Sequence, residues 1–318
     1  MLFNVDIKLW IRKVCQQHLP EIRNIYRVKE SPWSRVYHVL TAEKVFLCKV
    51  GPLSSGVTNE YRALSFLSTK RIQCVPQVIC YREGKDQALL LTPFIHQSGS
   101  YNAVKLGENL ARIHSLKHSK KNCEEFILGL LKTKENELSD LKYVWRQEAL
   151  RRIRLLERAG DILKQMNSLY RKQRKFFAKD PARFIHMDAQ DAVIPNEDQM
   201  YFVDWHMAGY GDPAYDLARL CEYEHQRTPL FDKGDFLKAY TGGNKLAESM
   251  AWRMDYYGLA SRIALLLYSF GDCANLVRYR ASPLVVSVRE RDFLVKLVDH
   301  KIGAHLQKIQ SDMERLSA

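Results

Sequence analysis

The stretch of sequence that decides the fold is FIHMDAQDAVIPNEDQMYFVDWHMAGYGDPAYDLA, residues 184–218. Within it, two apolar segments flank a polar loop, and each delivers an aspartate, Asp188 from the first and Asp204 from the second. Transfer of a phosphoryl group from ATP requires one carboxylate that receives the proton of the attacking hydroxyl and another that holds Mg²⁺ against the phosphates. By their spacing alone, two aspartates in a strand-rich region are equally consistent with turn residues. Other features of the sequence are needed to choose between these two interpretations.

The segment before this stretch, up to about residue 95, has the apolar pattern of strands with one helix among them. Val36–Leu40 and Val45–Val50 alternate at the two-residue period of a strand, and Thr41–Lys44 is the hairpin turn expected between them. Apolar residues at helical spacing then predict a helix over Thr58–Ser68. A second strand pair, residues 75–81 and 88–91, follows that helix. The expected order is strand, strand, helix, strand, strand.

The remainder of the chain has mostly helical periodicity. Helices are expected over Leu106–Leu116, in two or more pieces from about Glu124 to Phe177, near Met250–Phe270 and near Val288–Leu316. The exception is a strand-and-loop island at residues 184–203. This order predicts an α+β fold with two lobes, a small β-rich N-lobe at residues 1–95 and a larger helical C-lobe at residues 96–318.

The composition excludes several other classes of protein. With 318 residues, of which 46% are hydrophobic, the chain is long enough for a packed core. The N-terminus is interrupted by Asp6 and Lys8 and has no cleavage site for a secretory signal. The best apolar run, Ile263–Tyr268, is far shorter than the ~20 residues that span a bilayer. Seven scattered cysteines without a C-x-x-C pair indicate reduced, buried thiols. We therefore expect a cytoplasmic protein.

The formal net charge of +13 is concentrated in one helical segment, Leu141 to Arg183. This segment holds thirteen Lys or Arg and four acidic residues, a net charge of +9. Such a surface can attract phosphates, RNA or an anionic membrane surface, although a charged run is more often a solvated face. The aromatic residues of the segment form no recognisable nucleic-acid-binding module. An anionic partner at residues 141–183 is a prediction that rests on charge alone.

Three motifs of the deciding stretch resemble those of the aminoglycoside phosphotransferase and choline kinase superfamily. That superfamily has an H-x-D-x-x-x-x-N loop, a hydrophobic strand ending in D-W or D-F, and a helix start of the form G-D-P-x-x-D-L-A. The chain has His186-Met187-Asp188, Val203-Asp204-Trp205 and, starting at Gly211, G-D-P-A-Y-D-L-A. The likeness extends to Leu106–Leu116, which is similar to the first C-lobe helix of these kinases. The resemblance implies a bilobal, protein-kinase-like fold and ATP and Mg²⁺ as cofactors.

The resemblance also implies roles for individual residues. Asp188 corresponds to the base that receives the proton of the substrate hydroxyl, and His186 braces its loop. Asp204 corresponds to the Mg²⁺ ligand. Lys49 matches the lysine that neutralises the α- and β-phosphates from the third strand of these kinases, and Glu60 on the following helix matches the acid that holds it. The adenine-binding hinge corresponds to residues 91–95, which include Phe94.

Two departures from the family pattern bear on activity. The asparagine that provides the second metal ligand aligns with Val193, which has no oxygen to offer a hard cation. Asp191 or Asn196 can take its place, although Asn196 has the simpler interpretation of a hairpin-turn residue.

The other departure is the nucleotide-binding loop, residues 30–35, which contains no glycine. Ser34 and Arg35 can contact phosphate through their side chains, whereas Pro32 and Trp33 can equally fill the nucleotide's place.

Two functions follow from these observations. The first is an ATP-dependent kinase that phosphorylates the hydroxyl of a small molecule, as aminoglycoside, choline and thiamine kinases do. The alternative is a catalytically impaired pseudokinase that acts as a binding or scaffold protein. The strongly basic chain counts against polycationic aminoglycosides, but a local acidic wall would reverse that argument, so the substrate stays open.

Overall fold

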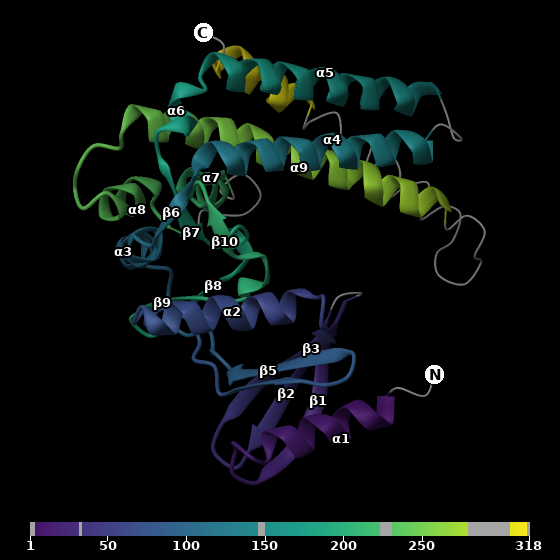
Figure 1. The fold of residues 1–318 in the computed structure, drawn as a ribbon, viewed down its shortest axis with the longest axis vertical. Coiled ribbons are helices and arrows are strands. Elements are labelled where there is room, and N and C mark those ends of the chain that lie inside the picture. The colour runs from purple at the N-terminus through teal and green to yellow at the C-terminus, as the bar shows by residue number, and fades with distance from the viewer. Residues whose placement is uncertain (1–3, 32–33, 146–149, 223–230, 279–305, 317–318) are drawn as a thin grey trace. The chain divides into compact units, whose positions relative to one another are not determined.

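The computed structural model describes residues 4–31, 34–145, 150–222, 231–278 and 306–316 (Figure 1). Its elements up to the hinge are α1 (Asn4–Cys15), β1 (Ile22–Glu30), β2 (Arg35–Thr41), β3 (Val45–Pro52), α2 (Gly56–Thr69), β4 (Cys80–Glu83) and β5 (Gln87–Pro93). The following elements are α3 (Ala103–His114), β6 (Lys117–Asn122), α4 (Cys123–Trp145), α5 (Leu150–Lys172), α6 (Lys175–Ala178), β7 (Pro181–Ile185), η1 (Ala189–Asp191), β8 (Val193–Asn196), β9 (Gln199–Phe202), η2 (Trp205–Met207), β10 (Gly209–Gly211), α7 (Pro213–Glu222), α8 (Lys233–Tyr240) and α9 (Glu248–Arg278). Residues 306–316 are also helical.

The chain forms two compact units that each combine segments distant in sequence. The first contains Met1–Lys117, Arg183–Tyr210 and Tyr223–Leu246, and the second contains His118–Ala182, Gly211–Glu222 and Ala247–Ala318. The deciding stretch of sequence is therefore divided, and both of its candidate catalytic aspartates lie in the first unit. The lobe boundary expected between residues 95 and 96 stays a prediction.

The first unit is built on an antiparallel five-stranded sheet in the order β1-β2-β3-β5-β4. Lys49 lies in the middle of this sheet, opposite Val36 of β2 and Leu90 of β5. Residues directly opposite one another point to the same face of a sheet, and successive residues point to opposite faces. Lys49 therefore shares its face with two apolar side chains, and its neighbours Cys48 and Val50 point to the other face.

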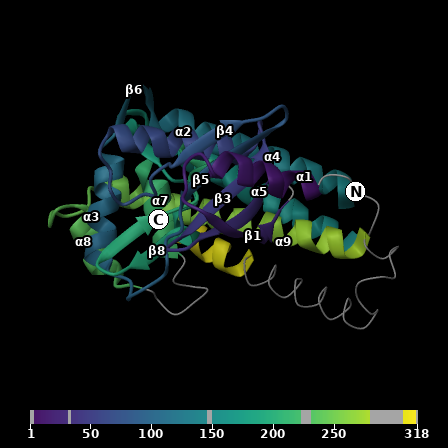
Figure 2. The same cartoon turned by 90° about the horizontal axis from the view of Figure 1, so that it is seen from below.

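Helix α1 covers the face of the sheet that points away from Lys49 (Figures 1 and 2). Ile7, Ile11 and Val14 repeat at helical spacing and form one apolar stripe. This stripe belongs to a single buried cluster with Cys48 and Val50. The helix is not among the elements expected from the sequence, because its apolar positions are separated by charged residues over only twelve residues in all. With one face of the sheet covered by α1, Lys49 lies on the other face, where it meets Glu60 of α2.

Helix α2 begins two residues before its expected start and ends one residue after its expected end. The hydroxyl of Ser55 accepts a hydrogen bond from the backbone N–H of Val57 at 3.3 Å and caps the first turn. The buried side of the helix carries Leu64 and Leu67, but also the carboxylate of Glu60. The helix packs against β3, β5 and η2. It thus brings an acidic side chain to the interior beside the strand of Lys49.

The first strand of the second predicted pair starts later than expected. The strand expected over residues 75–81 begins only at Cys80. Pro76 has no backbone N–H to donate to a ladder, and a proline inside a paired strand is disfavoured for that reason. Just before Cys80, Ile79 still donates its N–H to the carbonyl of Leu91 at 2.9 Å.

The hairpin of β8 and β9 rests on helix α3. Asn109 of α3 donates its side-chain amide to the backbone carbonyl of Met200 at 3.0 Å. Helix α3 in turn packs against α8, where any side chain at Gly107 would overlap the carbonyl oxygen of Phe236. Only glycine allows this approach. Asn196 is the last residue of β8 and pairs with Gln199, so it borders the two-residue turn of this hairpin, in keeping with its interpretation as a hairpin residue.

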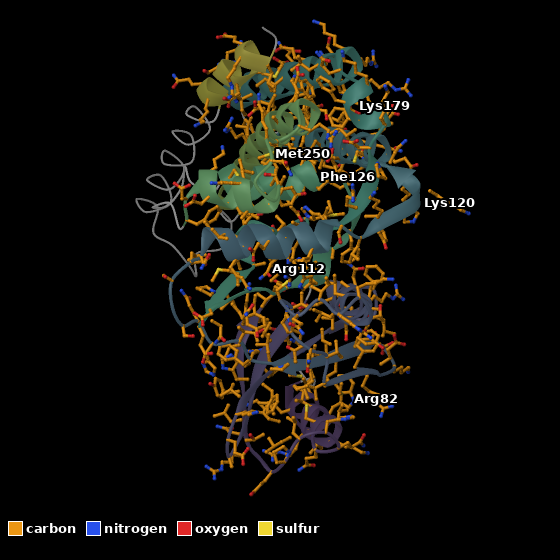
Figure 3. All side chains as sticks on the ribbon, turned by 90° about the vertical axis from the view of Figure 1, so that its left-hand side faces the viewer. Arg82, Arg112, Lys120, Phe126, Lys179 and Met250 are labelled. Carbon is orange, nitrogen blue, oxygen red and sulfur yellow. The ribbon has the colours of Figure 1, made fainter. Side chains whose placement is uncertain are left out.

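The second unit is mainly helical and contains one buried ionic cluster. Arg253 of α9 is fully buried and pairs with Asp180 at 2.6 Å and with Asp212 of the G-D-P motif at 2.8 Å. Phe126 of α4, labelled in Figure 3, packs edge-on against Tyr215 of α7 with 5.4 Å between ring centroids. The G-D-P segment is thus held to α9 by the buried side chain of Arg253.

Three sequence expectations concern the chain as a whole. The cysteines that the structure describes as free are all buried, which confirms that expectation for Cys15, Cys48, Cys74, Cys80, Cys123 and Cys221. Among the described residues, no helix has the length and apolarity needed to cross a lipid bilayer. Part of the basic segment, residues 146–149, lies outside the described residues. An anionic partner for that segment stays a prediction.

Candidate active site

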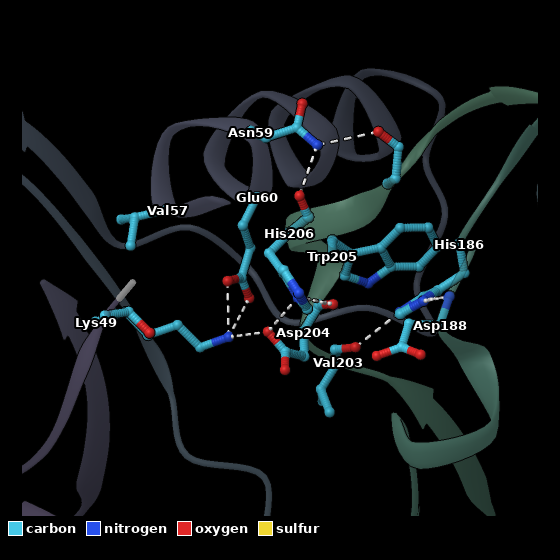
Figure 4. Close-up of polar contacts among 12 residues, drawn as sticks. Lys49, Val57, Asn59, Glu60, His186, Asp188, Val203, Asp204, Trp205 and His206 are labelled. Atoms are coloured by element: carbon cyan, nitrogen blue, oxygen red, sulfur yellow. Dashed lines mark hydrogen bonds and ion pairs between the residues drawn. The ribbon is translucent and has the colours of Figure 1, made fainter. Parts of the chain in front are cut away.

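The amine of Lys49 joins two carboxylates that are distant in sequence (Figure 4). Its Nζ donates to Oε1 and Oε2 of Glu60 at 2.9 and 2.7 Å and to Oδ1 of Asp204 at 2.6 Å. The side chains of Lys49 and Glu60 are buried, whereas that of Asp204 is 46% exposed. The structure thus brings together three of the residues singled out from the sequence, and one of them is open to solvent.

The electrostatic balance keeps Lys49 and Asp204 charged. Burial lowers the pKa of Lys49, but the charges of Glu60 and Asp204 outweigh it and raise the pKa above its ordinary value. Burial alone would raise the pKa of Asp204, yet the hydrogen bond from His206 and the charge of Lys49 hold it well below its usual range. For Glu60, burial is the largest effect and raises the pKa, although Lys49 partly offsets it. Asp204 is therefore ionised at neutral pH.

Asp204 is placed by an unusual backbone and a buried tryptophan. Its φ of 61° and ψ of 55° put it in the left-handed region, which few non-glycine residues adopt. The next residue, Trp205, is fully buried and donates its indole N–H to the carbonyl of Phe202 at 2.8 Å. A strained conformation of this kind persists only when the surroundings hold it, and such conformations cluster at functional sites.

The loop of Asp188 is braced by His186. Nε2 of His186 lies 2.8 Å from the carbonyl oxygen of Val203, which can only accept, so Nε2 carries the proton. Nδ1 then accepts the backbone N–H of Asp188 at 3.3 Å. Met187 between them has a φ of 68°. The carboxylate of Asp188 accepts a hydrogen bond from Gln190 at 2.6 Å. His186 thus ties the Asp188 loop to the strand end that delivers Asp204.

The structure also shows where Val193 and the two possible replacements for the missing asparagine ligand lie. Val193 is the first residue of β8, its side chain is buried, and its carbonyl accepts the hydroxyl of Tyr101 at 3.0 Å. Asn196 lies at the other end of β8 and donates its amide to the carbonyl of His96 at 2.8 Å. Asp191 is exposed at the end of η1. The side chain of Asn196 therefore ties the β8–β9 hairpin to the segment after β5.

The other predicted nucleotide contacts lie in the β1–β2 hairpin. Ser34 is bound within its own turn, because Ser31 donates its N–H to the Ser34 carbonyl at 2.8 Å and accepts the Ser34 N–H on its hydroxyl at 3.0 Å. Arg35 pairs with Glu30 at 2.9 Å and stands opposite Val50, whose side chain points away from Lys49. Pro32 and Trp33 lie outside the described residues. Phosphate contacts from Ser34 and Arg35 stay a prediction.

Phe94, at the predicted hinge, follows β5 and is partly buried. Its backbone N–H donates to the carbonyl of Val45 at 3.2 Å, so this donor is already used. Its ring packs edge-on between the imidazoles of His38 and His96, each 4.6 Å away between ring centroids. These rings lie at the end of the sheet face that carries Lys49. Contact of Phe94 with a nucleotide base stays a prediction.

The structure adds three residues that sequence reasoning missed. His206 donates from Nδ1 to Oδ1 of Asp204 at 3.0 Å. Asn59 of α2 donates to the backbone carbonyls of His206 and Ala208 at 2.9 and 3.0 Å. A side chain at Gly56 would lie 2.7 Å from Cβ of His206. The position of His206 two residues after Asp204 was the available signal, but the chemistry of a D-x-H triplet depends on a backbone turn that sequence does not reveal.

The described side chains hold a charged network beside an open carboxylate. Among the described residues no group of three or more His, Cys, Asp or Glu forms a closed metal site. Both of the hydrogen bonds that described side chains make to the Asp204 carboxylate go to Oδ1. A half-exposed, ionised carboxylate with a second oxygen available fits a cation that takes its remaining ligands from a phosphate and water.

Comparison with known proteins places these features in a family. The sequence profile of the phosphotransferase enzyme family matches residues 28–251. No curated protein sequence matches the chain significantly.

Several solved structures are similar over nearly the whole chain. One is a choline kinase from Cryptosporidium parvum Iowa II, with a TM-score of 0.63, 13% identity, and coverage of 98% of this chain and 97% of that chain. Another is a spectinomycin phosphotransferase in complex with ADP and spectinomycin, with a TM-score of 0.59, 14% identity, and coverage of 94% and 98%. A third is a thermostable aminoglycoside phosphotransferase mutant in complex with AMP-PNP and hygromycin B, with a TM-score of 0.58, 11% identity, and coverage of 93% and 98%. At these identities the likeness shows the fold, and it confirms the expected α+β, protein-kinase-like class.

Proposed function

Because the chain belongs to the phosphotransferase enzyme family, we propose that it transfers the terminal phosphoryl group of ATP to a hydroxyl group of a small molecule. The observation that carries this proposal is the Lys49 amine, held 2.7 Å from Glu60 and 2.6 Å from Asp204. A purely structural ion pair has no need of a second, half-exposed carboxylate. Phosphoryl transfer does need a cation and an adjacent carboxylate facing solvent, since its catalysis rests on positioning and charge neutralisation.

In this proposal Lys49 neutralises the phosphates of the nucleotide. Glu60 fixes the direction of the amine through two hydrogen bonds, so little side-chain entropy is lost when a phosphate arrives. The sheet face of Lys49 also carries Val36 and Leu90, and α1 closes the opposite face. A nucleotide is thereby directed to one side of the sheet.

Asp188 is the proposed base for the substrate hydroxyl. Gln190 orients its carboxylate at 2.6 Å, and His186 holds its backbone N–H. His186 acts here as a positioning residue, because both of its ring nitrogens already serve the backbone. Loss of a proton from the hydroxyl to Asp188 accompanies attack on the phosphorus, which is the general-base role of an aspartate in this chemistry.

Asp204 is the proposed ligand of Mg²⁺. When bound, the cation neutralises the charge that develops on the phosphate oxygens. Asp204 fits this role through its ionised state and its exposure, whereas Val193 offers neither a charge nor a free side-chain oxygen.

The substrate is proposed only as a class. The family and the hydroxyl-directed base support a hydroxylated amine, sugar or nucleoside-like metabolite. The net charge of +13 disfavours a polycationic aminoglycoside in the absence of a local acidic wall.

Calorimetric titration with ATP, with and without Mg²⁺, tests the proposal first. We expect Mg²⁺-dependent binding to the wild-type chain. Asp204→Asn should weaken that binding, and Asp188→Asn should preserve binding while removing turnover in a screen of hydroxyl substrates. Asp198→Asn, in the exposed turn of the β8–β9 hairpin, is the matched control and should change neither. Equal, small effects of the two active-site variants would contradict the assigned roles.

The alternative is a pseudokinase that binds a partner through the same fold. The buried Val193 side chain, which replaces a metal-binding amide with an apolar group, favours it. Absence of ATP binding under both conditions of the titration would establish this alternative and overturn the kinase.

A further inference from the structure

The first observation is that the proposed kinase has fewer protein ligands for its divalent cation than this chemistry usually uses. Val193 is 8% exposed, and its backbone carbonyl is engaged by Tyr101. Asn196 lies at the other end of β8, where its amide nitrogen donates to the carbonyl of His96 at 2.8 Å. If Asp204 alone held the ion, the protein would contribute one ligand where this chemistry usually has two.

The second observation is a nitrogen atom at ligand distance from Asp204. Nδ1 of His206 lies 3.0 Å from Oδ1 of Asp204 (Figure 4). Two adjacent ligands of an octahedral ion, each about 2.1 Å from the metal and at right angles, stand about 3 Å apart. The two side chains are 37% and 46% exposed, so an ion from solvent can reach both.

The geometry points to His206 as the second protein ligand of the divalent cation. This inference rests on the proposed function, because it concerns the cation that accompanies the nucleotide. The Nδ1 proton that His206 now donates to Asp204 leaves to solvent, and the imidazole binds the ion as a neutral ligand. Lys49 does not exclude the ion, because Oδ1 of Asp204 has two lone pairs: the leaving His206 proton frees one of them for the ion, and Lys49 occupies the other.

The surroundings fix His206 in the required place. Asn59 of α2 holds the carbonyl of His206 and that of Ala208. Gly56 lets the first turn of α2 come so close that a Cβ there would lie 2.7 Å from Cβ of His206. Trp205 is anchored in the core on the other side. A ligand that is positioned before the ion arrives costs little ordering on binding.

A nitrogen ligand changes which cation the site prefers. Carboxylates, carbonyls and water suit Mg²⁺, while imidazole favours the later divalent ions, and Mn²⁺ accepts both kinds of ligand. We therefore expect the site to favour Mn²⁺ over Mg²⁺ by more than an all-oxygen site does. Replacing the imidazole with a carboxylate should remove that preference.

The experiment uses Mn²⁺ as a paramagnetic probe with ADP and the full chain. Loss of the free Mn²⁺ resonance on titration gives the affinity, and competition with Mg²⁺ gives the preference. Pulsed electron resonance on the bound ion, with the protein labelled with ¹⁵N-histidine, reports directly on a histidine nitrogen and separates it from the nitrogens of adenine. The variants are His206→Glu and, as the matched control, His18→Glu, which makes the same change at an exposed site.

The expected result is a histidine nitrogen coupling in the wild type and in the control. His206→Glu should lose the coupling and lower the ratio of Mn²⁺ to Mg²⁺ affinity by about tenfold or more. Bound Mn²⁺ without a histidine coupling, and an unchanged ratio in His206→Glu, would overturn the inference and leave the proposed function standing. Absence of ADP binding with any cation would overturn both.

Discussion

Removal of the Lys49 amine should destabilise the protein by an amount that grows with pH. In Lys49→Met the Glu60 carboxylate, 4% exposed, loses the two hydrogen bonds of 2.9 and 2.7 Å that compensate its burial. Removing one partner of a buried ion pair typically costs about 3–5 kcal/mol. The alternative for Glu60 is to take up a proton, because burial already raises its pKa and the charge that offsets it is gone.

The pH dependence follows from that proton. A carboxyl with a raised pKa in the folded state retains its proton there, while the unfolded chain releases it above about pH 4.3. The folded variant then binds more protons than the unfolded one, so the free energy of unfolding falls as pH rises, by up to about 1.4 kcal/mol per pH unit. Lys49→Met should therefore lose more stability relative to wild type at pH 8 than at pH 5.5.

Urea unfolding at these two pH values measures the effect. Lys164→Met removes an exposed lysine that pairs with Asp161 at 3.0 Å, and it should change stability by less than about 0.5 kcal/mol at either pH. The double variant Lys49→Met/Glu60→Leu removes the buried charge and should recover most of the loss. A loss that is the same at both pH values, or a double variant as unstable as the single one, would refute the reasoning.

Three further predictions concern Gly56 and the histidines His206 and His38. Gly56→Ala should destabilise the chain by about 1–3 kcal/mol, because the new Cβ would lie 2.7 Å from Cβ of His206. The control Gly129→Ala, with open space around the new Cβ, should be neutral or stabilising. Thermal unfolding compares the two variants, and equal changes in stability would contradict the close approach of Gly56 to His206. In NMR titrations of the imidazoles, His206 should titrate above the ordinary pKa of about 6.5 and His38 below it, because the hydrogen bond to Asp204 raises the first pKa and burial lowers the second. Since the folded state binds the proton of His206 more tightly, its contribution to stability is complete at pH 6 and is lost as pH rises through the folded pKa, so His206→Gln should be more destabilising at pH 6 than at pH 8.

Most of the elements around the site were accessible from sequence because their periodicity is local. The strand of Lys49 and the helix of Glu60 show their periods within about ten residues, and the structure has both. Helix α1 was missed because its apolar stripe is short and interrupted by charges. The strand expected from residue 75 was too long because Pro76 lies inside an apolar run. In both cases the tertiary partner, not the local pattern, decides where the element begins.

The residues of the site also fall into a group that the sequence revealed and a group that only the structure revealed. Lys49, Glu60 and Asp204 stood out because each has a position in a motif, and the structure brings them within 2.9 Å of one another through the lysine amine. Nothing in the spacing of Gly56, Asn59 and His206 marks them as neighbours. Their contacts depend on the left-handed backbone of Asp204, which turns the chain so that the side chain two residues later faces the same carboxylate.

The left-handed backbone at Asp204, which brings His206 to the carboxylate, offers a physical account of how the chain can tolerate valine at position 193. The Val193 side chain is buried beside its partner Phe202, where an amide would have to satisfy two donors and an acceptor away from water. An apolar residue at that position strengthens the β8–β9 hairpin at the expense of a ligand. His206, in contrast, is supported by α2 and reached by solvent. In a chain that moved its second ligand in this way, loss of the asparagine would be a change in the preferred metal and not a loss of catalysis.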